Sequence, residues 1–195
     1  MESTTNKFSF DNFNTFDEPA LIKALDRSKR FVEDIKSHPY QNGRVLTLCG
    51  VCGTGKTLLA RCILTALKLD GWGFCDSIKE ELHGGQLVQF KARFFDMRKV
   101  SDAMKQGRWG IVEDMEEPHL VILDDIGADY DPNKITASKI DRVLRSRSGK
   151  WTVATINLGL KDIAEKLDSR IASFIVRDEN VFVEINAIDY ALRKI

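Results

Sequence analysis

Short, continuous apolar runs recur along the chain, and stretches of mostly helical spacing separate them. Such runs, bounded by polar residues, are typical of strands that are buried on both faces of a parallel sheet. The alternation of strands with helical stretches favours an α/β fold, a five-stranded parallel sheet flanked by helices. The expected strands span residues 45–49, 87–95, 119–125, 151–156 and 181–185.

Apolar residues at helical spacing predict the segments between the strands. Asp96 is placed to cap a helix that bears Met97, Val100 and Met104 and ends near Gly107. Asp131–Pro132 predicts a turn before a later helix, and residues 70–86, with four glycines, predict an irregular excursion. The expected helices lie within residues 18–38, 56–69, 96–107, 135–144, 161–167 and 169–176.

Residues 1–17 are polar except for four phenylalanines, at positions 8, 10, 13 and 16. This pattern predicts a linker that docks aromatic rings onto a single domain formed by residues 18–195. The N-terminus lacks the apolar core of a signal peptide.

Composition narrows the class of protein without naming a function. The 29 basic residues balance 29 acidic ones, so any contact with DNA has to come from a local patch. No apolar run approaches the length of a membrane span. Cys49 and Cys52 form a C-x-x-C pair without a second pair at zinc-site spacing, and Cys62 and Cys75 add no disulfide framework. We expect a cytoplasmic protein with free thiols.

A glycine-rich loop follows the first expected strand. Gly50, Gly55, Lys56 and Thr57 match the phosphate-binding pattern G-x-x-x-x-G-K-[ST]. Glycines let the backbone fold around an anion with its N–H groups inward, and the next helix adds its positive end. The sequence therefore predicts a site for ATP and Mg²⁺, with Lys56 on the phosphates and Thr57 on the metal. The expected nucleotide contacts are Gly50, Val51, Cys52, Gly53, Thr54, Gly55, Lys56, Thr57 and Leu58.

Three further positions are candidates for the chemistry of hydrolysis. Asp124 and Asp125 end a buried strand, where the first could hold Mg²⁺ and the second could orient and deprotonate water. The alternative is a pair of carboxylates that caps a turn. Asn157 ends the next strand and could touch the γ-phosphate, although asparagine is also common turn chemistry. Arg170 could reach a neighbouring subunit's nucleotide, or it could be an ordinary surface arginine.

In this order, the loop, the Asp-Asp strand end, the asparagine and the late arginine resemble the AAA+ ATPases. Three details resemble the DnaC/IstB-like branch of helicase loaders and transposition ATPases: the Phe8–Phe13 lead, Asp124-Asp125-Ile-Gly127, and a chain that stops soon after the fifth strand. The resemblance covers about residues 8–185. It implies a P-loop AAA+ (ASCE) sheet without the C-terminal helical lid. Loaders also tend to carry a separate N-terminal helicase-binding segment; because fewer than twenty residues precede the first expected helix, we expect that segment to be absent or reduced to the Phe-rich lead.

The resemblance also implies roles for single residues. The sensor amide of the family falls on Asn157 and its arginine finger on Arg170, which implies self-association with Arg170 acting in trans. The second arginine that many loaders carry four positions later is replaced by Phe174, and Arg177 lies nearby.

Members of this family line a channel with the region after the second strand. Here that region interleaves basic and aromatic residues, which suits single-stranded DNA but also describes a solvated helix face. Its members are Lys91, Arg93, Phe94, Phe95, Arg98, Lys99, Lys105, Arg108 and Trp109. A second basic cluster, formed by Arg142, Arg145 and Arg147, suits either a subunit interface or DNA.

The resulting hypothesis is an ATP-hydrolysing replication protein that loads or remodels a replicative helicase on single-stranded DNA. The main alternative is a transposition ATPase that assembles on duplex DNA and recruits a transposase. A small-molecule phosphotransferase and a binding module with a degenerate site remain open alternatives.

Overall fold

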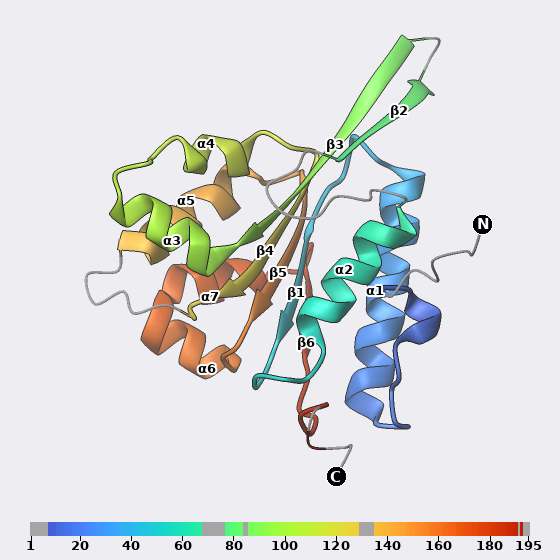
Figure 1. Ribbon diagram of the computed structural model, residues 1–195, viewed down its shortest axis with the longest axis vertical. Helices are drawn as coiled ribbons and strands as arrows, with labels where there is room; N and C mark the ends of the chain where they lie inside the picture. Colours follow the sequence, from blue (N-terminus) through green and yellow to red (C-terminus); the bar gives the residue numbers. More distant parts are fainter. Residues whose placement is uncertain (1–7, 68–76, 84–85, 129–134, 191, 193–195) are drawn as a thin grey trace, which may run out of the picture.

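The computed structural model describes residues 8–67, 77–83, 86–128, 135–190 and 192. The predicted turn at Asp131–Pro132 lies outside these residues. Six strands form one sheet in the order β2-β3-β4-β5-β1-β6 (Figure 1). The strands are β1 (Val45–Cys49), β2 (Ser77–His83), β3 (Gln86–Asp96), β4 (Leu120–Ile126), β5 (Trp151–Ile156) and β6 (Val181–Glu184).

Five of these strands run parallel, as the sequence predicts. They are β3, β4, β5, β1 and β6, which pair with one another in parallel along the sheet. The sixth, β2, pairs antiparallel with β3 at the edge of the sheet. The prediction of an irregular excursion was therefore wrong for residues 77–83, because polar residues at a sheet edge carry no continuous apolar run.

Helices cover both faces of the sheet. On one face lie α1 (Pro19–Ser37) and α2 (Lys56–Ala66), and the other face carries the remaining helices (Figure 1). These are α3 (Met97–Lys105), α4 (Ile111–Glu116), α5 (Ile135–Ser146), α6 (Leu160–Asp162), a π-helical turn (Ile163–Leu167) and α7 (Ser169–Ile175). Asp96 caps α3 as predicted, by accepting the Arg98 N–H. The sequence missed α4, which is short and buries only Val112 and Met115.

Two hydrophobic clusters lie on the two faces of the sheet, and β1 contributes to both. Leu46 and Leu48 join the cluster under α1 and α2, whereas Val45 and Cys49 join the cluster under α3, α5 and α7. This is the side-chain alternation of a strand that is covered on both faces. All five residues of β1 are buried, so the loop that follows β1 starts from a firmly packed strand.

The N-terminal segment packs along the α1 and α2 face. Its described part includes the 3₁₀ turn Phe10–Asn12. Phe13 is buried in the cluster on this face, and Phe10 packs partly against the same cluster. No described helix is long and apolar enough to cross a membrane.

The structure corrects the prediction of a basic surface cluster at the end of α5. Arg147 is buried, with 1% of its surface exposed. Its guanidinium donates to the carbonyls of Met115, Pro118 and Trp151 and to the Thr152 hydroxyl. Burial lowers its pKa to about 9. Arg147 is thus a structural residue that ties the end of α5 to the start of β4 and β5.

The other two arginines of that predicted cluster are paired on the surface. Arg142 forms ion pairs with Glu113 and Glu116 of α4. Arg145 pairs with Asp141 one turn earlier on α5. Each positive charge faces a carboxylate, so this region lacks the unopposed charge that a DNA-binding patch requires.

Candidate nucleotide-binding site

The phosphate-loop residues connect β1 to α2 at the carboxyl edge of the sheet (Figure 1). Gly50, Gly53 and Gly55 all have positive φ, at 133°, 78° and 88°. A Cβ on Gly50 would lie 2.4 Å from the Ile185 carbonyl oxygen, and one on Gly53 would lie 2.1 Å from the Asp189 carboxyl group. Glycine is therefore required here both by backbone conformation and by close packing.

The ammonium group of Lys56 lies inside the curve of this loop. Its Nζ donates to the carbonyl oxygens of Gly50 and Val51, at 3.0 and 2.5 Å, and to the Thr54 hydroxyl at 3.2 Å. Only 4% of the residue is exposed, and burial lowers its pKa. A poorly solvated ammonium group surrounded by the loop is suited to binding an anionic phosphate.

Asp124 lies beside the start of α2, as expected for a residue that holds Mg²⁺ with Thr57. The Thr57 hydroxyl donates to its two carboxylate oxygens, at 2.9 and 3.2 Å. Thr155 of β5 donates to the same carboxylate at 2.7 Å. Asp124 is 7% exposed, and burial raises its pKa, whereas the two hydroxyls lower it.

These oxygens fit a magnesium ion bound together with a nucleotide. No group of three His, Cys, Asp or Glu side chains gathers among the described residues. Mg²⁺ does not need such a group, because it takes most of its ligands from phosphates and water and only one or two from the protein. Thr57 and Asp124 would hold the ion, which would neutralise phosphate charge.

Asp125 lies next to this pair and has an unusual backbone. Its φ is 64°, and the pairing of β4 with β5 shifts register between Leu123 and Ile126. Its backbone N–H donates a hydrogen bond to the Thr155 hydroxyl oxygen at 2.8 Å. Thr155 therefore contacts both carboxylate residues at once and positions them relative to each other.

Both carboxylate oxygens of Asp125 have partners. Asn157 Nδ2 donates to Oδ1 at 2.8 Å, so the structure brings together the predicted water-orienting carboxylate and the predicted sensor amide. An amino group of Arg98 lies 3.2 Å from Oδ2. Sequence reasoning grouped Arg98 with the DNA-facing residues and missed this contact. The pairing of Asp96 with Asp124 across β3 and β4 explains it, because the first turn of α3 then starts beside the end of β4.

Arg170 lies in the first turn of α7, where its guanidinium faces the carboxylates of Asp168 and Asp141. Asp168 caps α7 and also accepts from the Arg170 Nε and an amino group, at 3.1 and 2.8 Å. Asp141 lies 4.0 Å away. The side chain is 59% exposed. The chain thus presents Arg170 at its surface.

Phe174 stands where many loaders carry a second arginine, and here its side chain is part of the core. Only 4% of the residue is exposed. The guanidinium of Arg177 lies over its ring, 5.0 Å from the centroid.

Segments from both ends of the described chain meet at the phosphate loop. The Tyr190 N–H donates to the Gly53 carbonyl at 3.0 Å. Its ring contacts Phe13 and Phe16, and its hydroxyl bonds the Asn14 carbonyl. Sequence reasoning missed Tyr190, because it follows the last strand without a motif and comes to the loop only through the pairing of β6 with β1.

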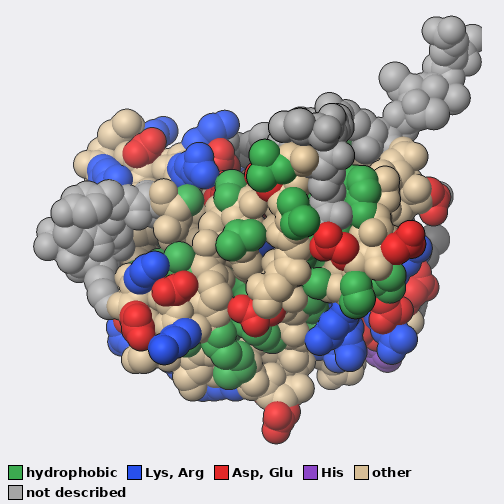
Figure 2. Space-filling model, turned by 90° about the horizontal axis from the view of Figure 1, so that it is seen from below, with side chains coloured by type: hydrophobic (Ala, Val, Ile, Leu, Met, Phe, Trp, Pro, Cys, Tyr) green, Lys and Arg blue, Asp and Glu red, His purple; other side chains and the backbone are tan. Residues whose placement is uncertain are grey.

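Apolar side chains are exposed around this edge. Figure 2 views the edge from below and shows apolar groups across its middle, with acidic and basic groups between them. Val51 of the loop is 60% exposed, and Ile188 and Leu192 of the C-terminal segment are 60% and 62% exposed.

Of the residues predicted to line a DNA path, some are buried or paired with carboxylates, and others are more exposed. Phe95 is buried in the core. Lys91 and Arg93 of β3 pair with Glu117 and Asp114. The prediction was wrong for Phe95 as a stacking platform, because its side chain packs into the core cluster under α3 and α5.

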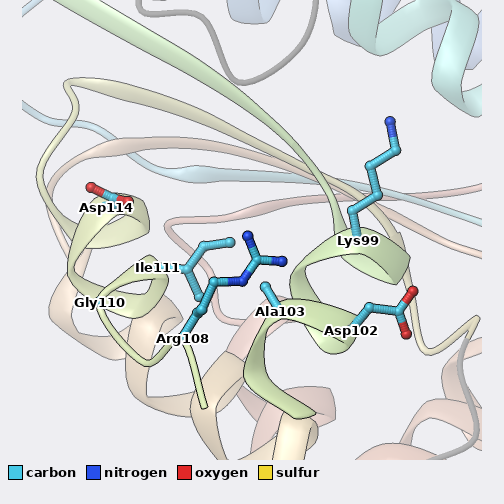
Figure 3. A pocket seen from close by; sticks show the side chains of 7 residues that line it. All are labelled: Lys99, Asp102, Ala103, Arg108, Gly110, Ile111 and Asp114. Carbon is cyan, nitrogen blue, oxygen red and sulfur yellow. The ribbon is translucent and has the colours of Figure 1, made fainter. Parts of the chain in front are cut away.

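The more exposed members surround a pocket of about 590 Å³ between α3 and α4. Figure 3 shows the Arg108 side chain extending between Ala103 and Ile111, with Lys99 on the side of α3. Trp109 is 47% exposed, with the Lys139 ammonium 5.6 Å from its ring centroid. Acidic residues also line the pocket, namely Asp102 and Asp114.

No protein-family model matches the chain, and no curated protein matches it. Solved structures do match it. DnaI is 19% identical with a TM-score of 0.68, over 93% of this chain and 89% of that chain. The DnaC helicase loader is 21% identical with a TM-score of 0.67, over 92% and 97%.

The chain has the AAA+ fold of the helicase loaders. This finding confirms, at the level of the fold, the resemblance to the DnaC-like branch. The replication initiator DnaA, in a structure with AMPPCP and single-stranded DNA, is 15% identical with a TM-score of 0.65. The match covers 96% of this chain and 52% of that DnaA chain, so this chain spans about half of its length.

Proposed function

We propose that the protein is a cytoplasmic ATPase of DNA replication, which binds MgATP at Gly50–Thr57 and hydrolyses it slowly in an assembly with copies of itself. The observation that carries this proposal is one connected set of contacts. Lys56 lies inside the loop, Thr57 bonds Asp124, and Asn157 bonds Asp125. The fold shared with DnaC and DnaI supports a role in replication.

The roles follow from the positions of the side chains. Lys56 and the N–H groups at the start of α2 bind the phosphates, and Thr57 and Asp124 hold Mg²⁺, which neutralises charge on them. Asp125 accepts the proton of the attacking water, and Asn157 positions that water. Aspartate is a shorter base than glutamate, so we expect turnover below about 10 per second, the median for enzymes.

Completion of the site requires a second copy of the chain in this proposal. Arg170 is exposed, and its ion pairs with Asp168 and Asp141 orient it at the surface. Placed against the phosphates of a neighbouring subunit, it would stabilise the charge of the transition state. The exposed apolar side chains around the phosphate loop, such as Val51, give a neighbouring subunit a surface to cover.

We further propose that the protein loads or remodels a replicative helicase and contacts single-stranded DNA through α3 and α4. Lys99, Arg108 and Trp109 supply two cationic groups and one exposed ring on this surface. Cations that follow the backbone and rings that stack on bases suit a single strand of any sequence. The acidic residues of the same pocket make the predicted binding weak and sensitive to salt.

Two variants test the site. Lys56→Ala is expected to lose ATP binding, and Arg170→Ala to keep ATP binding but lose about 10³-fold in hydrolysis. Mixing Arg170→Ala with Asp125→Asn subunits should restore part of the activity, because an intact site forms between the two. Arg30→Ala is the control, since Arg30 is also a surface arginine paired with a nearby aspartate. A mixture that stays inactive, under conditions where mixed oligomers form, contradicts the proposed action in trans.

The partner is tested by capture from native cells with an ATP analogue present. Recovery of a replicative helicase supports the proposal. Recovery of a transposase, with assembly on duplex rather than single-stranded DNA, favours a transposition ATPase instead.

A further inference from the structure

We infer that Asp189 sets the affinity of the phosphate loop for its nucleotide, by placing a negative charge against the loop that opposes the negative charge of the phosphates. The inference rests on the proposed function, because it assigns a further residue to the same nucleotide site. It makes the segment after β6 part of that site.

The carboxyl group of Asp189 is in direct contact with Gly53. A Cβ built on Gly53 would lie 2.1 Å from the Asp189 Cγ and Oδ2 and 2.5 Å from its Oδ1. The carboxyl group therefore fills the space that any other side chain at position 53 would need. Gly53 has φ of 78°, so the loop bends at the point where this carboxyl group touches it.

The backbone holds the carboxyl group in this position. Ile185 donates its N–H to the Cys49 carbonyl at 2.8 Å, and Tyr190 donates its N–H to the Gly53 carbonyl at 3.0 Å. These two hydrogen bonds flank Asp189: the first joins the segment to the end of β1, and the second joins it to the loop. The Tyr190 ring packs beside Gly55, where a Cβ would lie 3.2 Å from it.

The charges near the loop make this contact unfavourable for a polyanion. The Lys56 ammonium lies inside the loop, and the carboxyl group of Asp189 lies on the Gly53 backbone three residues earlier. A triphosphate bound by the loop would bring further negative charge near that carboxylate, and water and salt would screen the repulsion only in part. Removal of the charge should favour the most highly charged nucleotide most.

The experiment compares nucleotide affinity in the Asp189→Asn variant and the wild-type protein. Asparagine keeps the size of the side chain and removes its charge. Binding of MgATP, MgADP and AMP is measured by calorimetry at low and high salt. Asp178→Asn is the matched control, since Asp178 is exposed in the turn before β6, near Asn180, which bonds the opposite end of β1.

Asp189→Asn is expected to bind MgATP about threefold to tenfold more tightly, MgADP less so and AMP least, with the gain shrinking at high salt. Asp178→Asn is expected to leave all three affinities unchanged. Asp189→Ser should reproduce the gain, and thermal unfolding of each variant shows whether the fold is kept. Unchanged or weaker binding in both variants at position 189 overturns the inference.

The same binding measurements also distinguish a failure of this inference from a failure of the proposed function on which it rests. Weaker binding of ribonucleotides, with 2′-deoxynucleotides unaffected, would make Asp189 an acceptor for the sugar hydroxyls and reject a repulsive role. If the wild-type protein binds no nucleotide but Asp189→Asn does, the inference holds. If neither binds, both the inference and the proposed function fail. Wild-type binding that Lys56→Ala abolishes and Asp189→Asn does not improve rejects the inference alone.

Discussion

Replacement of Arg98 with alanine is expected to increase ATP hydrolysis measured without DNA. Arg98 lies 3.2 Å from one carboxylate oxygen of Asp125, and Asn157 bonds the other oxygen. Both oxygens of this carboxylate therefore already have partners, which obstructs the approach of an attacking water to either of them. Loss of Arg98 frees one oxygen for the attacking water.

The magnitude follows from the exposure of this ion pair. The Arg98 side chain is 58% exposed and that of Asp125 is 26% exposed. A pair so open to solvent contributes about 0.5–1 kcal/mol. Because about 1.4 kcal/mol corresponds to a factor of ten, the basal rate should rise about twofold to fivefold.

The assay is steady-state phosphate release at saturating MgATP, with and without single-stranded DNA. Lys105→Ala is the matched control, because Lys105 is a cation of the same helix that lies 3.9 Å from Asp102. We expect Arg98→Ala to raise the rate without DNA and to reduce the further stimulation by DNA. A fall of tenfold or more, with ATP affinity unchanged, would refute the reasoning and make Arg98 a residue that positions Asp125.

Two further predictions concern stability. Arg147→Met should lower the free energy of unfolding, measured in urea, by about 3 kcal/mol, because it leaves buried carbonyl oxygens without donors. The control is Arg142→Met at the surface, which should cost less than about 1 kcal/mol. A loss that small for Arg147→Met would contradict the prediction. Burial lowers the pKa of His119 from its ordinary 6.5, so below pH 6.5 the unfolded chain takes up a proton that the folded chain resists, and stability falls as the pH falls. His119→Asn, which keeps an acceptor for the Lys91 N–H, should lose part of the drop in melting temperature between pH 7.5 and 5.5. His38→Asn, at an exposed histidine, should behave as wild type; an equal pH response in all three proteins would exclude His119 as the source.

The parallel sheet was predictable because its central strands β1, β4 and β5 are buried and carry mostly apolar runs. β3 instead interleaves apolar with polar residues. β1 and β5 begin and end at the predicted residues. The edge strand β2 was missed, since polar residues there carry no such run. Helix α4 was missed for a similar reason, because two buried residues are too few to establish a helical stripe.

Within the candidate site, local motifs were predictable and contacts between distant segments were not. Gly50–Thr57 is one continuous segment, and its backbone requires glycine at set positions, so spacing alone indicates the loop. The carboxylate and amide at the ends of β4 and β5 were predictable as well, because parallel strands end at one edge of a sheet. Arg98 and Asp189 carry no motif, and neither lies at the end of a strand.

The sequence by itself therefore determined the parallel part of the sheet, the phosphate loop and the identities of the groups at its edge, since these depend on burial and on local backbone geometry. Only the tertiary structure decided how each charge is used. It buried Arg147 among carbonyl oxygens and paired Arg98 with Asp125. It also brought Asp189 against Gly53 through the pairing of β6 with β1. The physical reason is that the energy of a charge depends on its burial and on its partners, and the folded chain sets both.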